Sequence, residues 1–456
     1  MPVRTIAETN SSYYLIYFDK NGVERREADG SMLSKAVARL IGDPVEGVTD
    51  VFFASHGWKG DVPAAIEQYD RWVGEMVRSP DHAASIAARH EFKAMVVGLH
   101  WPSLPFGDEN IMREGGLLSD ENVDSMERQI DRYAASIGDT PVTRTAIRTI
   151  LEAAQRDDGE RDALPEEARN AYDKLFAEAF AGYIGVGGLG APPGADHDDW
   201  DPDAIYRDAL KAEAAESTEG GPGLLSGGSL ERLRGLFVAP LQQLSFWKMK
   251  DRARRIGESG GHALLRDLQR AASPGTRFHL MGHSFGCIVV SAAVAGVPGG
   301  ASPSRTVDSL FLAQGALSLW SYCSDIPYTP GEAGYFSRII NDGLVQGPIV
   351  TTRSIHDSAV RKLYPYAAGV AGQFVLDEDL PMYGGVGTFG AQGLGALAED
   401  RIMQSPTVAY GFKRGRVYNL EASGTIKNGG GFSGAHSDIA HPEVAHAMWQ
   451  AVLALK

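Results

Sequence analysis

The stretch from Arg277 to Ala295 reads RFHLMGHSFGCIVVSAAVA, and it decides the fold that we predict. A short, mostly apolar run at 278–281 leads into GHSFG at 282–286, and a longer apolar run follows at 287–294. This pattern predicts a strand, a tight turn and a buried helix. Gly-x-Ser-x-Gly in that setting is typical of a nucleophile elbow, in which a strained turn exposes the serine hydroxyl. Glycine is needed at both positions because strand and helix approach closely there.

The composition is that of a soluble globular protein. The 456 residues are 43% hydrophobic and 22% charged, and no apolar run is long enough to span a bilayer. The N-terminal residues lack the apolar stretch and cleavage site of a signal peptide, so we expect a cytoplasmic protein without stable membrane insertion. Cys287 and Cys323 are the only cysteines, too few for a disulfide framework, and Cys287 is predicted to be a small core residue.

Acidic residues are concentrated in one segment. The chain has 43 basic and 58 acidic residues, a net charge of −15, and residues 104–240 alone contain 13 basic and 28 acidic ones. The rest of the chain is therefore balanced, which indicates that the acidic segment is an insertion. An acidic surface disfavours nucleic acids and anionic membranes, and we expect neither as a partner.

Strand and helix patterns alternate on both sides of this acidic segment. Before it, apolar runs at 12–18, 49–55 and 92–99 predict strands, and helical periodicity covers 32–41 and 64–77. After it, we predict a long helix, the strand and helix of the elbow, three more strands and a closing helix, at 244–272, 277–295, 307–313, 347–352, 417–420 and 441–455. Such alternation predicts a mostly parallel, doubly wound α/β sheet covered on both faces.

Residues 104–240 interrupt that alternation. They show helical patterns and glycine-rich joints at 185–194 and 220–228, and they contain no convincing strand. We predict a core domain formed by 1–103 and 241–456, with 104–240 as a large helical, acidic cap laid over the active edge of the sheet. A separate domain with an unrelated function is the alternative.

A serine hydroxyl needs a base to become a nucleophile, and the base needs an acid to orient it. In a strand–helix alternation with a nucleophile elbow, these partners follow the serine in the order acid, then histidine, on loops after strands. Asp357 follows the strand predicted at 347–352, and His436 lies in a glycine-flanked loop between the last strand and the closing helix. We therefore predict Ser284, Asp357 and His436 as the catalytic residues.

Both partners of the serine have rivals in the sequence. Asp325 follows the strand before that of Asp357, and Asp377 and Asp379 lie in a more polar loop. His441 and His446 lie at or inside the closing helix, where packing or surface roles are more common. Loop position therefore favours Asp357 and His436.

An oxyanion that develops on a substrate carbonyl needs two backbone N–H donors. We predict that Phe285, which follows the nucleophile, supplies one, and that Trp58 in the loop after the strand 49–55 supplies the other. Gly57 lets this loop approach the substrate, whereas His56 is predicted to be a structural anchor. Substrate contacts are predicted for Gly57, His283 and Trp101, which flank these loops.

Other motifs in the chain do not indicate a cofactor or a metal. The segments 185–190 and 385–390 fit Gly-x-Gly-x-x-Gly, but neither follows a predicted strand nor opens a predicted helix, so we expect no dinucleotide. The run DHDDWDPD at 196–203 lacks the glycine and closing glutamate of a calcium loop. The histidines and cysteines include no His-Glu-x-x-His and no Cys-x-x-Cys, and we expect no metal.

With HGW at 56–58, GHSFG at 282–286, Asp357 after its strand and GAHSD at 434–438, the chain resembles α/β-hydrolase-fold serine hydrolases of the esterase and lipase type. Outside the insertion, the resemblance extends from about residue 12 to the C-terminus. It implies an eight-stranded, mostly parallel sheet, a Ser-Asp-His triad and an acyl-enzyme mechanism that needs no cofactor.

The resulting expectation is a serine hydrolase that cleaves a small-molecule ester or a lipid-like acyl substrate. Amide, thioester or carbon–carbon bond cleavage and acyl transfer use the same three residues and stay open as alternatives. A non-catalytic scaffold that binds partners through the cap is a further alternative. A lipid-surface enzyme whose cap opens at an interface is another. The oligomeric state is not indicated by the sequence.

Overall fold

The computed structural model describes most of the chain. The described residues are 3–58, 62–88, 91–103, 123–156, 163–180, 200–207, 209–210, 236–363, 380–381, 384–429 and 434–454. The glycine-rich joints predicted at 185–194 and 220–228 lie outside these ranges.

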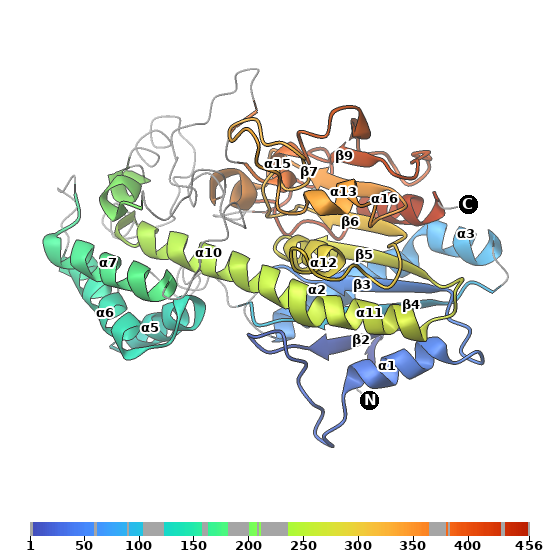
Figure 1. Cartoon of the computed structure of the whole chain (residues 1–456), viewed down its shortest axis with the longest axis horizontal. Coiled ribbons are helices and arrows are strands. Elements are labelled where there is room, and N and C mark those ends of the chain that lie inside the picture. Colours follow the sequence, from blue (N-terminus) through green and yellow to red (C-terminus); the bar gives the residue numbers. More distant parts are fainter. Residues whose placement is uncertain are drawn as a thin grey trace.

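A nine-stranded sheet forms the centre of the molecule (Figure 1). Its strands are β1 (Val3–Ile6), β2 (Ser11–Tyr17), β3 (Asp50–Ser55), β4 (Ala94–His100), β5 (Arg277–His283), β6 (Ser309–Ala313), β7 (Ile349–Arg353), β8 (Ala398–Ile402) and β9 (Val417–Glu421). They lie in the order β1-β2-β4-β3-β5-β6-β7-β9-β8. Only β1 pairs antiparallel, with β2. The mostly parallel α/β fold is confirmed, but the sheet has nine strands where the resemblance implied eight.

Helices cover both faces of the sheet. In the part of the chain that the structure describes, the helical elements outside the acidic segment are α1 (Leu33–Gly42), α2 (Val62–Arg78), α3 (Pro80–Ala88), α10 (Ala239–Ile256), α11 (His262–Ala271), α12 (Gly286–Ala295), α13 (Ser337–Asn341), α15 (Val386–Phe389), α16 (Pro442–Leu453), the π-helical turns η2 (Gly257–Gly261) and η3 (Ala359–Leu363), and the 3-10 turn η4 (Gly395–Leu397). One apolar cluster joins the sheet to α1, α10, α11 and α12, and another joins it to α2 and α16.

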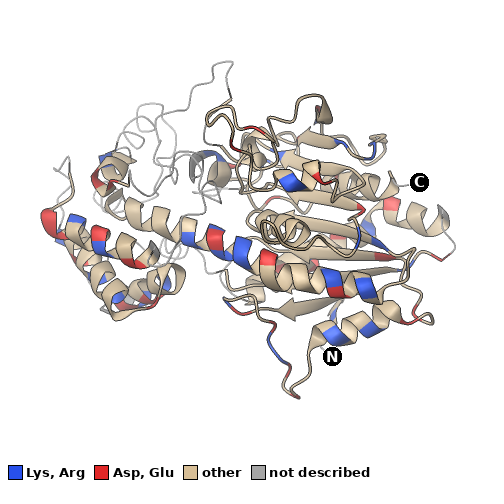
Figure 2. Cartoon of the chain, in the orientation of Figure 1, with Lys and Arg blue, Asp and Glu red and all other residues tan. Residues whose placement is uncertain are grey.

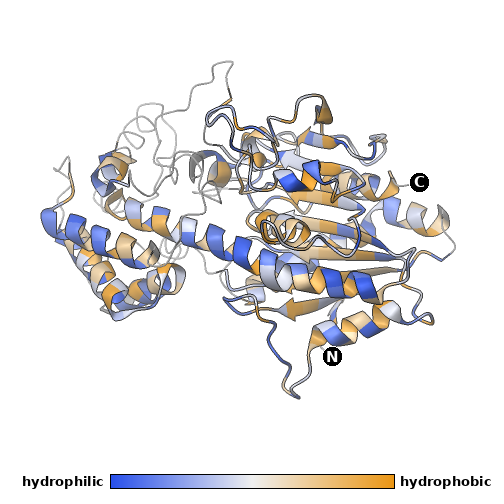
Figure 3. Cartoon of the chain, in the orientation of Figure 1, coloured by the Kyte–Doolittle hydropathy of each residue, from blue (hydrophilic) through white to orange (hydrophobic). Residues whose placement is uncertain are grey.

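Strand β3 shows why the central strands are apolar throughout. Val51 and Phe53 face the cluster on the α12 side, whereas Phe52 and Ala54 face the cluster on the α16 side. Because successive side chains of a strand point to opposite faces, a strand with helices on both sides has no polar face. In Figure 3 the inner strands and α12 are coloured mostly as hydrophobic.

A single long helical rod crosses the front of the sheet in Figure 1. It consists of α10, the π-helical turn η2 and α11, and it agrees with the helix predicted at 244–272. Gly257 lies where this rod crosses α12, and a Cβ there would lie 2.5 Å from the carbonyl oxygen of Val289. Glycine thus lets the two helix backbones pack directly against each other.

The first half of α10 belongs to a separate helical group on the left of Figure 1. Further helices of this group are α5 (Val123–Ile137), α6 (Pro141–Arg156) and α7 (Glu166–Phe180), and the described residues 202–207 are helical as well. Their apolar faces surround a cluster that includes Ile147, Ile150, Leu175 and, from α10, Leu244. Charged residues of both signs lie along the outer faces of these helices (Figure 2). Trp247 packs against this cluster and against that of the sheet, so α10 joins the two cores.

Within the described residues, no helix is long and apolar enough to cross a membrane. Cys287 and Cys323 are both buried and free of disulfide bonds.

Candidate active site

The predicted elbow has the geometry that its sequence implies. Ser284 lies between β5 and α12 with a backbone φ of +56°, a conformation that residues other than glycine rarely adopt. A Cβ on Gly282 would lie 2.6 Å from the backbone nitrogen of Cys287, so the strand and helix are too close for a side chain. A Cβ on Gly286 would lie 2.6 Å from the carbonyl oxygen of His56, so this glycine makes room for the end of β3 instead.

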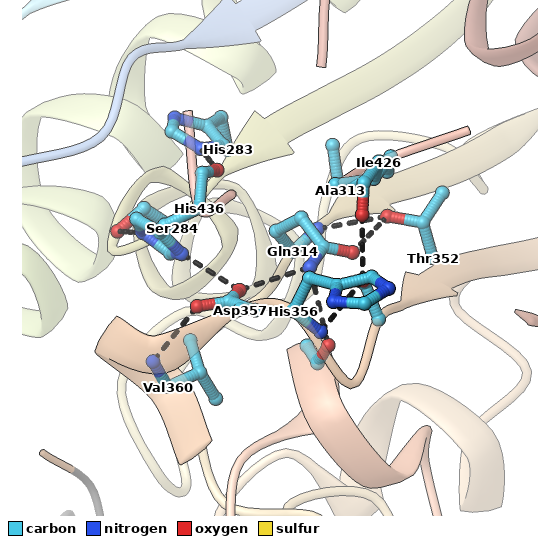
Figure 4. Close-up of polar contacts among 12 residues, drawn as sticks. His283, Ser284, Ala313, Gln314, Thr352, His356, Asp357, Val360, Ile426 and His436 are labelled. Atoms are coloured by element: carbon cyan, nitrogen blue, oxygen red, sulfur yellow. Dashed lines mark hydrogen bonds and ion pairs between the residues drawn. The ribbon is translucent and has the colours of Figure 1, made fainter. Parts of the chain in front are cut away.

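The structure brings Ser284, His436 and Asp357 together (Figure 4). Nε2 of His436 lies 2.7 Å from Oγ of Ser284, and Nδ1 lies 2.8 Å from Oδ2 of Asp357. Because a carboxylate only accepts hydrogen bonds, Nδ1 carries the ring proton and Nε2 accepts from the serine hydroxyl. The three side chains form one continuous hydrogen-bonded relay between loops that follow β5, β7 and β9.

Three donors hold the carboxylate of Asp357, which is fully buried. Besides His436, the amide of Gln314 donates to Oδ2 at 2.9 Å, and the backbone N–H of Val360 donates to Oδ1 at 2.9 Å. Such donors satisfy the oxygens of a buried carboxyl group, which would otherwise be costly to remove from water. Sequence reasoning missed Gln314, although its place directly after the predicted strand 307–313 was a usable signal.

The rival residues lie in other settings. Asp325 is exposed and accepts a hydrogen bond from the backbone N–H of Gly331. His441 pairs with Asp438 at the start of α16, and His446 within α16 pairs with Asp81 of α3. None of these rivals reaches Ser284 or His436. Asp377 and Asp379 lie outside the described residues.

The loop after β3 passes directly against the nucleophile. A Cβ on Gly57 would lie 2.7 Å from Cβ of Ser284, so only glycine allows this approach. The indole of Trp58 packs on the ring of Phe285, with ring centroids 5.4 Å apart. No described residue accepts a hydrogen bond from the backbone N–H of Phe285, which precedes the first turn of α12. The two predicted oxyanion donors thus belong to segments that meet beside Ser284.

His283 ties the base to this loop through a second residue that sequence reasoning missed. Its Nε2 donates to the carbonyl oxygen of His436 at 2.9 Å, and its Nδ1 accepts from the amide of Gln68 at 2.6 Å. The other end of that amide accepts from the backbone N–H of Gly57 at 3.4 Å. Gln68 is the buried polar residue in the apolar stripe of α2, a signal that could have singled it out.

His56 and Trp101 pack together and hold the same loop in place. The rings stack at 5.7 Å between centroids, and both are fully buried. The indole of Trp101 donates to the carbonyl oxygen of His56 at 3.2 Å, and Nε2 of His56 accepts from the backbone N–H of Trp101 at 3.3 Å. His56 therefore anchors the loop, and a contact between Trp101 and the substrate stays a prediction.

A second Ser–His–Asp arrangement lies inside the sheet. Nδ1 of His279 lies 2.8 Å from Oγ of Ser309, and its Nε2 lies 3.1 Å from Oδ1 of Asp50. All three are at most 3% exposed, and Asp50 is also paired with Arg277 at 3.0 Å. No substrate reaches a serine buried within a sheet, so this arrangement is structural.

Cys287 follows the elbow closely but is not a candidate nucleophile. Its side chain is fully buried, and burial raises the pKa of the thiol well above its ordinary value. The thiol therefore stays neutral and unreactive. Among the described residues, no group of three or more His, Cys, Asp or Glu side chains is arranged to hold a metal ion.

A family model described as alpha/beta hydrolase matches residues 237–312, from just before α10 to within β6. This match supports the α/β-hydrolase superfamily. No curated protein and no solved structure matches the chain. The α/β-hydrolase match includes the elbow with Ser284 and supports hydrolase activity, but it ends before Asp357 and His436.

The segment 385–390 has a structural role near the candidate site that its glycines did not indicate. Contrary to expectation, it opens a helix, the four-residue α15. The carbonyl oxygen of Gly387 in this helix accepts from the amide of Gln314 at 3.2 Å. A Cβ on Gly387 would lie 2.8 Å from the backbone of Gln314. This glycine-rich segment therefore packs against Gln314, next to the carboxylate of Asp357.

Proposed function

We propose that this chain is a serine hydrolase that cleaves a small-molecule carboxylic ester through an acyl-enzyme intermediate. The observation that carries the proposal is the relay of hydrogen bonds from Ser284 through His436 to the buried Asp357. A strained, positive-φ serine beside a correctly oriented histidine has no evident structural purpose, because the strain costs stability.

The proposed reaction has two halves. Oγ of Ser284 attacks the ester carbonyl while its proton moves to Nε2 of His436, and that proton then passes to the departing alcohol. A water molecule gives a proton to the same nitrogen and attacks the acyl-enzyme, and the carboxylic acid is released as the proton returns to Oγ. Asp357 holds the imidazole in the productive tautomer and stabilises its cation throughout.

The oxyanion formed in each half is proposed to accept hydrogen bonds from the backbone N–H groups of Phe285 and Trp58. The location of Phe285 supports this role, because it lies at the positive end of the dipole of α12, a helix of ten residues. The close approach of Gly57 to Ser284 supports a donor from the next residue of the same loop.

Residues 104–240 are proposed to form a cap that limits which esters reach Ser284. The separate apolar cluster of α5, α6, α7 and the first half of α10 supports an independent helical unit. Residues of α10 belong both to this cluster and to that of the sheet, which supports a boundary of the proposed unit within this helix. An ester panel that varies acyl chain length tests what the cap admits.

The direct test of the function is turnover of chromogenic carboxylic esters by the purified chain and two serine variants. Ser284→Ala removes the nucleophile and is expected to lower turnover by at least 10³-fold. Ser309→Ala removes the serine of the buried Ser–His–Asp arrangement and is the matched control, with turnover close to that of the unaltered chain. Equal turnover for all three proteins would show that Ser284 is not the nucleophile.

A further inference from the structure

Gln314 occupies an unusual position directly after β6. It has a φ of +46°, it is fully buried, and all its polar side-chain atoms are hydrogen-bonded. A strained residue with a fully satisfied buried amide persists only where its surroundings determine it strongly.

The amide of Gln314 links three segments of the chain (Figure 4). Its Nε2 donates to Oδ2 of Asp357 at 2.9 Å and to the carbonyl oxygen of Gly387 at 3.2 Å. Its Oε1 accepts from the hydroxyl of Thr352 at 2.9 Å, and that hydroxyl accepts from the backbone N–H of Gln314 at 3.0 Å. The carboxylate of Asp357 and the carbonyl oxygen of Gly387 can only accept hydrogen bonds, so the N–H end of the amide must face them and Oε1 faces the hydroxyl of Thr352.

The amide and the imidazole share one carboxylate oxygen. Oδ2 of Asp357 accepts from both Gln314 and His436, whereas Oδ1 accepts from the backbone N–H of Val360. A donor on Oδ2 withdraws negative charge from the atom that faces the imidazole. It therefore stabilises the carboxylate and weakens the attraction of the carboxylate for an imidazolium.

We propose that Gln314 is a positioning residue that orients the carboxylate of Asp357 and lowers the basicity of His436 through it. The inference rests on the proposed function of Ser284, His436 and Asp357. Without the Gln314 donor, the charge on Oδ2 is less dispersed, the imidazolium is stabilised, and the base stays protonated to a higher pH.

Other titratable and charged groups lie around this pair but do not bond the carboxylate. They are His283 on β5, His356 and Arg361 in the segment after β7, and Asp438 in the loop of His436. Among the described residues, only His436, Gln314 and Val360 donate hydrogen bonds to the carboxylate of Asp357. A change at Gln314 therefore acts on the carboxylate directly.

The test is the pH dependence of the rate at which a fluorophosphonate labels Ser284. Gln314→Met keeps the length of the side chain and removes its donor. The ascending limb of the rate is expected to shift upward by about half a pH unit or more. The plateau is expected to fall by roughly tenfold as the carboxylate loses its orientation.

A pair of neighbouring threonines supplies a variant with less disruption and a matched control. Thr352→Val removes the hydroxyl that orients Gln314 and should shift the limb in the same direction by a smaller amount. Thr351→Val alters the adjacent residue of β7, which is equally buried and also bonds an amide, that of Asn419 at 3.0 Å. Because Asn419 does not touch Asp357, this variant should leave the limb unchanged.

Different results overturn the role of Gln314 and the proposed function of Ser284. If the labelling rate of Ser284 rises over the same pH range in the unaltered chain and in all three variants, the role of Gln314 is overturned and the proposed function stays intact. A limb that shifts as much in Thr351→Val as in Thr352→Val would also overturn it, because a purely structural effect would then suffice. Absence of labelling at Ser284 in the unaltered, folded chain would instead overturn the proposed function.

Discussion

Backbone strain at Ser284 is the feature that most clearly separates this serine from the other serines that the structure describes. Its φ of +56° is forced by the sharp change from β5 to α12, with Gly282 and Gly286 making room on either side. Strain of this kind at a reactive residue is a cost in stability that the surrounding structure must offset.

That cost can be measured by comparing two inactive variants. Ser284→Ala and Ser284→Gly both lack the hydroxyl, so they differ chiefly in how well the residue tolerates a positive φ. The glycine variant is expected to be more stable by about 1 kcal/mol in urea unfolding. An alanine variant as stable as the glycine variant would show that the turn is not strained.

Asp50 allows a prediction about pH. Burial alone would raise the pKa of this carboxyl, but the hydrogen bond and charge of His279 and the charge of Arg277 outweigh burial and hold the pKa well below its usual range. A depressed pKa in the folded state adds stability above the unfolded pKa of about 3.9, and this stability is lost as the pH falls below that value.

Asp50→Asn is therefore expected to lower the free energy of unfolding by about 3 kcal/mol at pH 7, and by less below pH 4. Asp267→Asn breaks exposed pairs with Lys35 and Arg270 and serves as the control, with an effect below about 1 kcal/mol. Urea unfolding at pH 7 and pH 3.5 measures both. If the loss of unfolding free energy in Asp50→Asn is larger at pH 3.5 than at pH 7, the depressed pKa of Asp50 is contradicted.

At the residue scale, the sequence predicted contacts between side chains that follow from the order of the strands. It did not predict contacts that depend on which distant side chains pair in the folded chain. The parallel strands end at one edge of the sheet, so the order Ser284, Asp357, His436 was enough to predict which side chains meet. The partners of Gln314 and Gln68 lie on strands or loops far away in the sequence. No local pattern indicates which buried amide faces which carboxylate or ring.

Elements at the centre of the sheet were predictable because burial on both faces imposes a continuous apolar run. The edge strands β1 and β8 were missed because they are not buried on both faces and so have no continuous apolar run. β8 reads AEDRI, and none of its residues is fully buried, so it lacks the apolar signature of its neighbours. Polar and charged residues are what an edge strand needs to avoid pairing with another chain.

The contact between the elbow and β3 gives a prediction at this scale. Gly286→Ala places a methyl group against the carbonyl oxygens of Ser55 and His56, so we expect a loss of about 1–3 kcal/mol in stability. We also expect a lower labelling rate at Ser284, because the loop of Gly57 must move.

Gly275→Ala is the matched control for that variant. Gly275 lies in the turn before β5, and a Cβ there would meet nothing within 4 Å. Thermal unfolding of both variants should show a lower melting temperature for Gly286→Ala only. An equal melting temperature in both would mean that the elbow and β3 are not tightly packed.

At the scale of the whole molecule, α10 is the element that makes the helical group and the sheet interdependent. Its first half packs among α5, α6 and α7, and its second half packs on α12. The sequence indicated an interruption of the α/β pattern at 104–240, but the pattern of a helix does not show that it belongs to two cores at once.

This shared helix predicts that the helical group and the sheet unfold together. Ile150→Ala opens a cavity in the cluster of the helical group and should cost about 2–5 kcal/mol. We expect the single unfolding transition to move to lower temperature. Val142→Ala, at a 47% exposed position on the same helix, should have little effect. A separate, earlier transition in the Ile150 variant, with Ser284 still reactive, would show that the two parts are independent.

The most direct test of the central claim is to label the folded chain with a fluorophosphonate and to map the adduct by peptide mass. We predict a single adduct on Ser284 that is lost when His436 is changed to alanine, because the hydroxyl then has no base. An adduct that persists at Ser284 without His436, or a folded chain that is not labelled at all, would contradict the claim that Ser284 is an activated nucleophile.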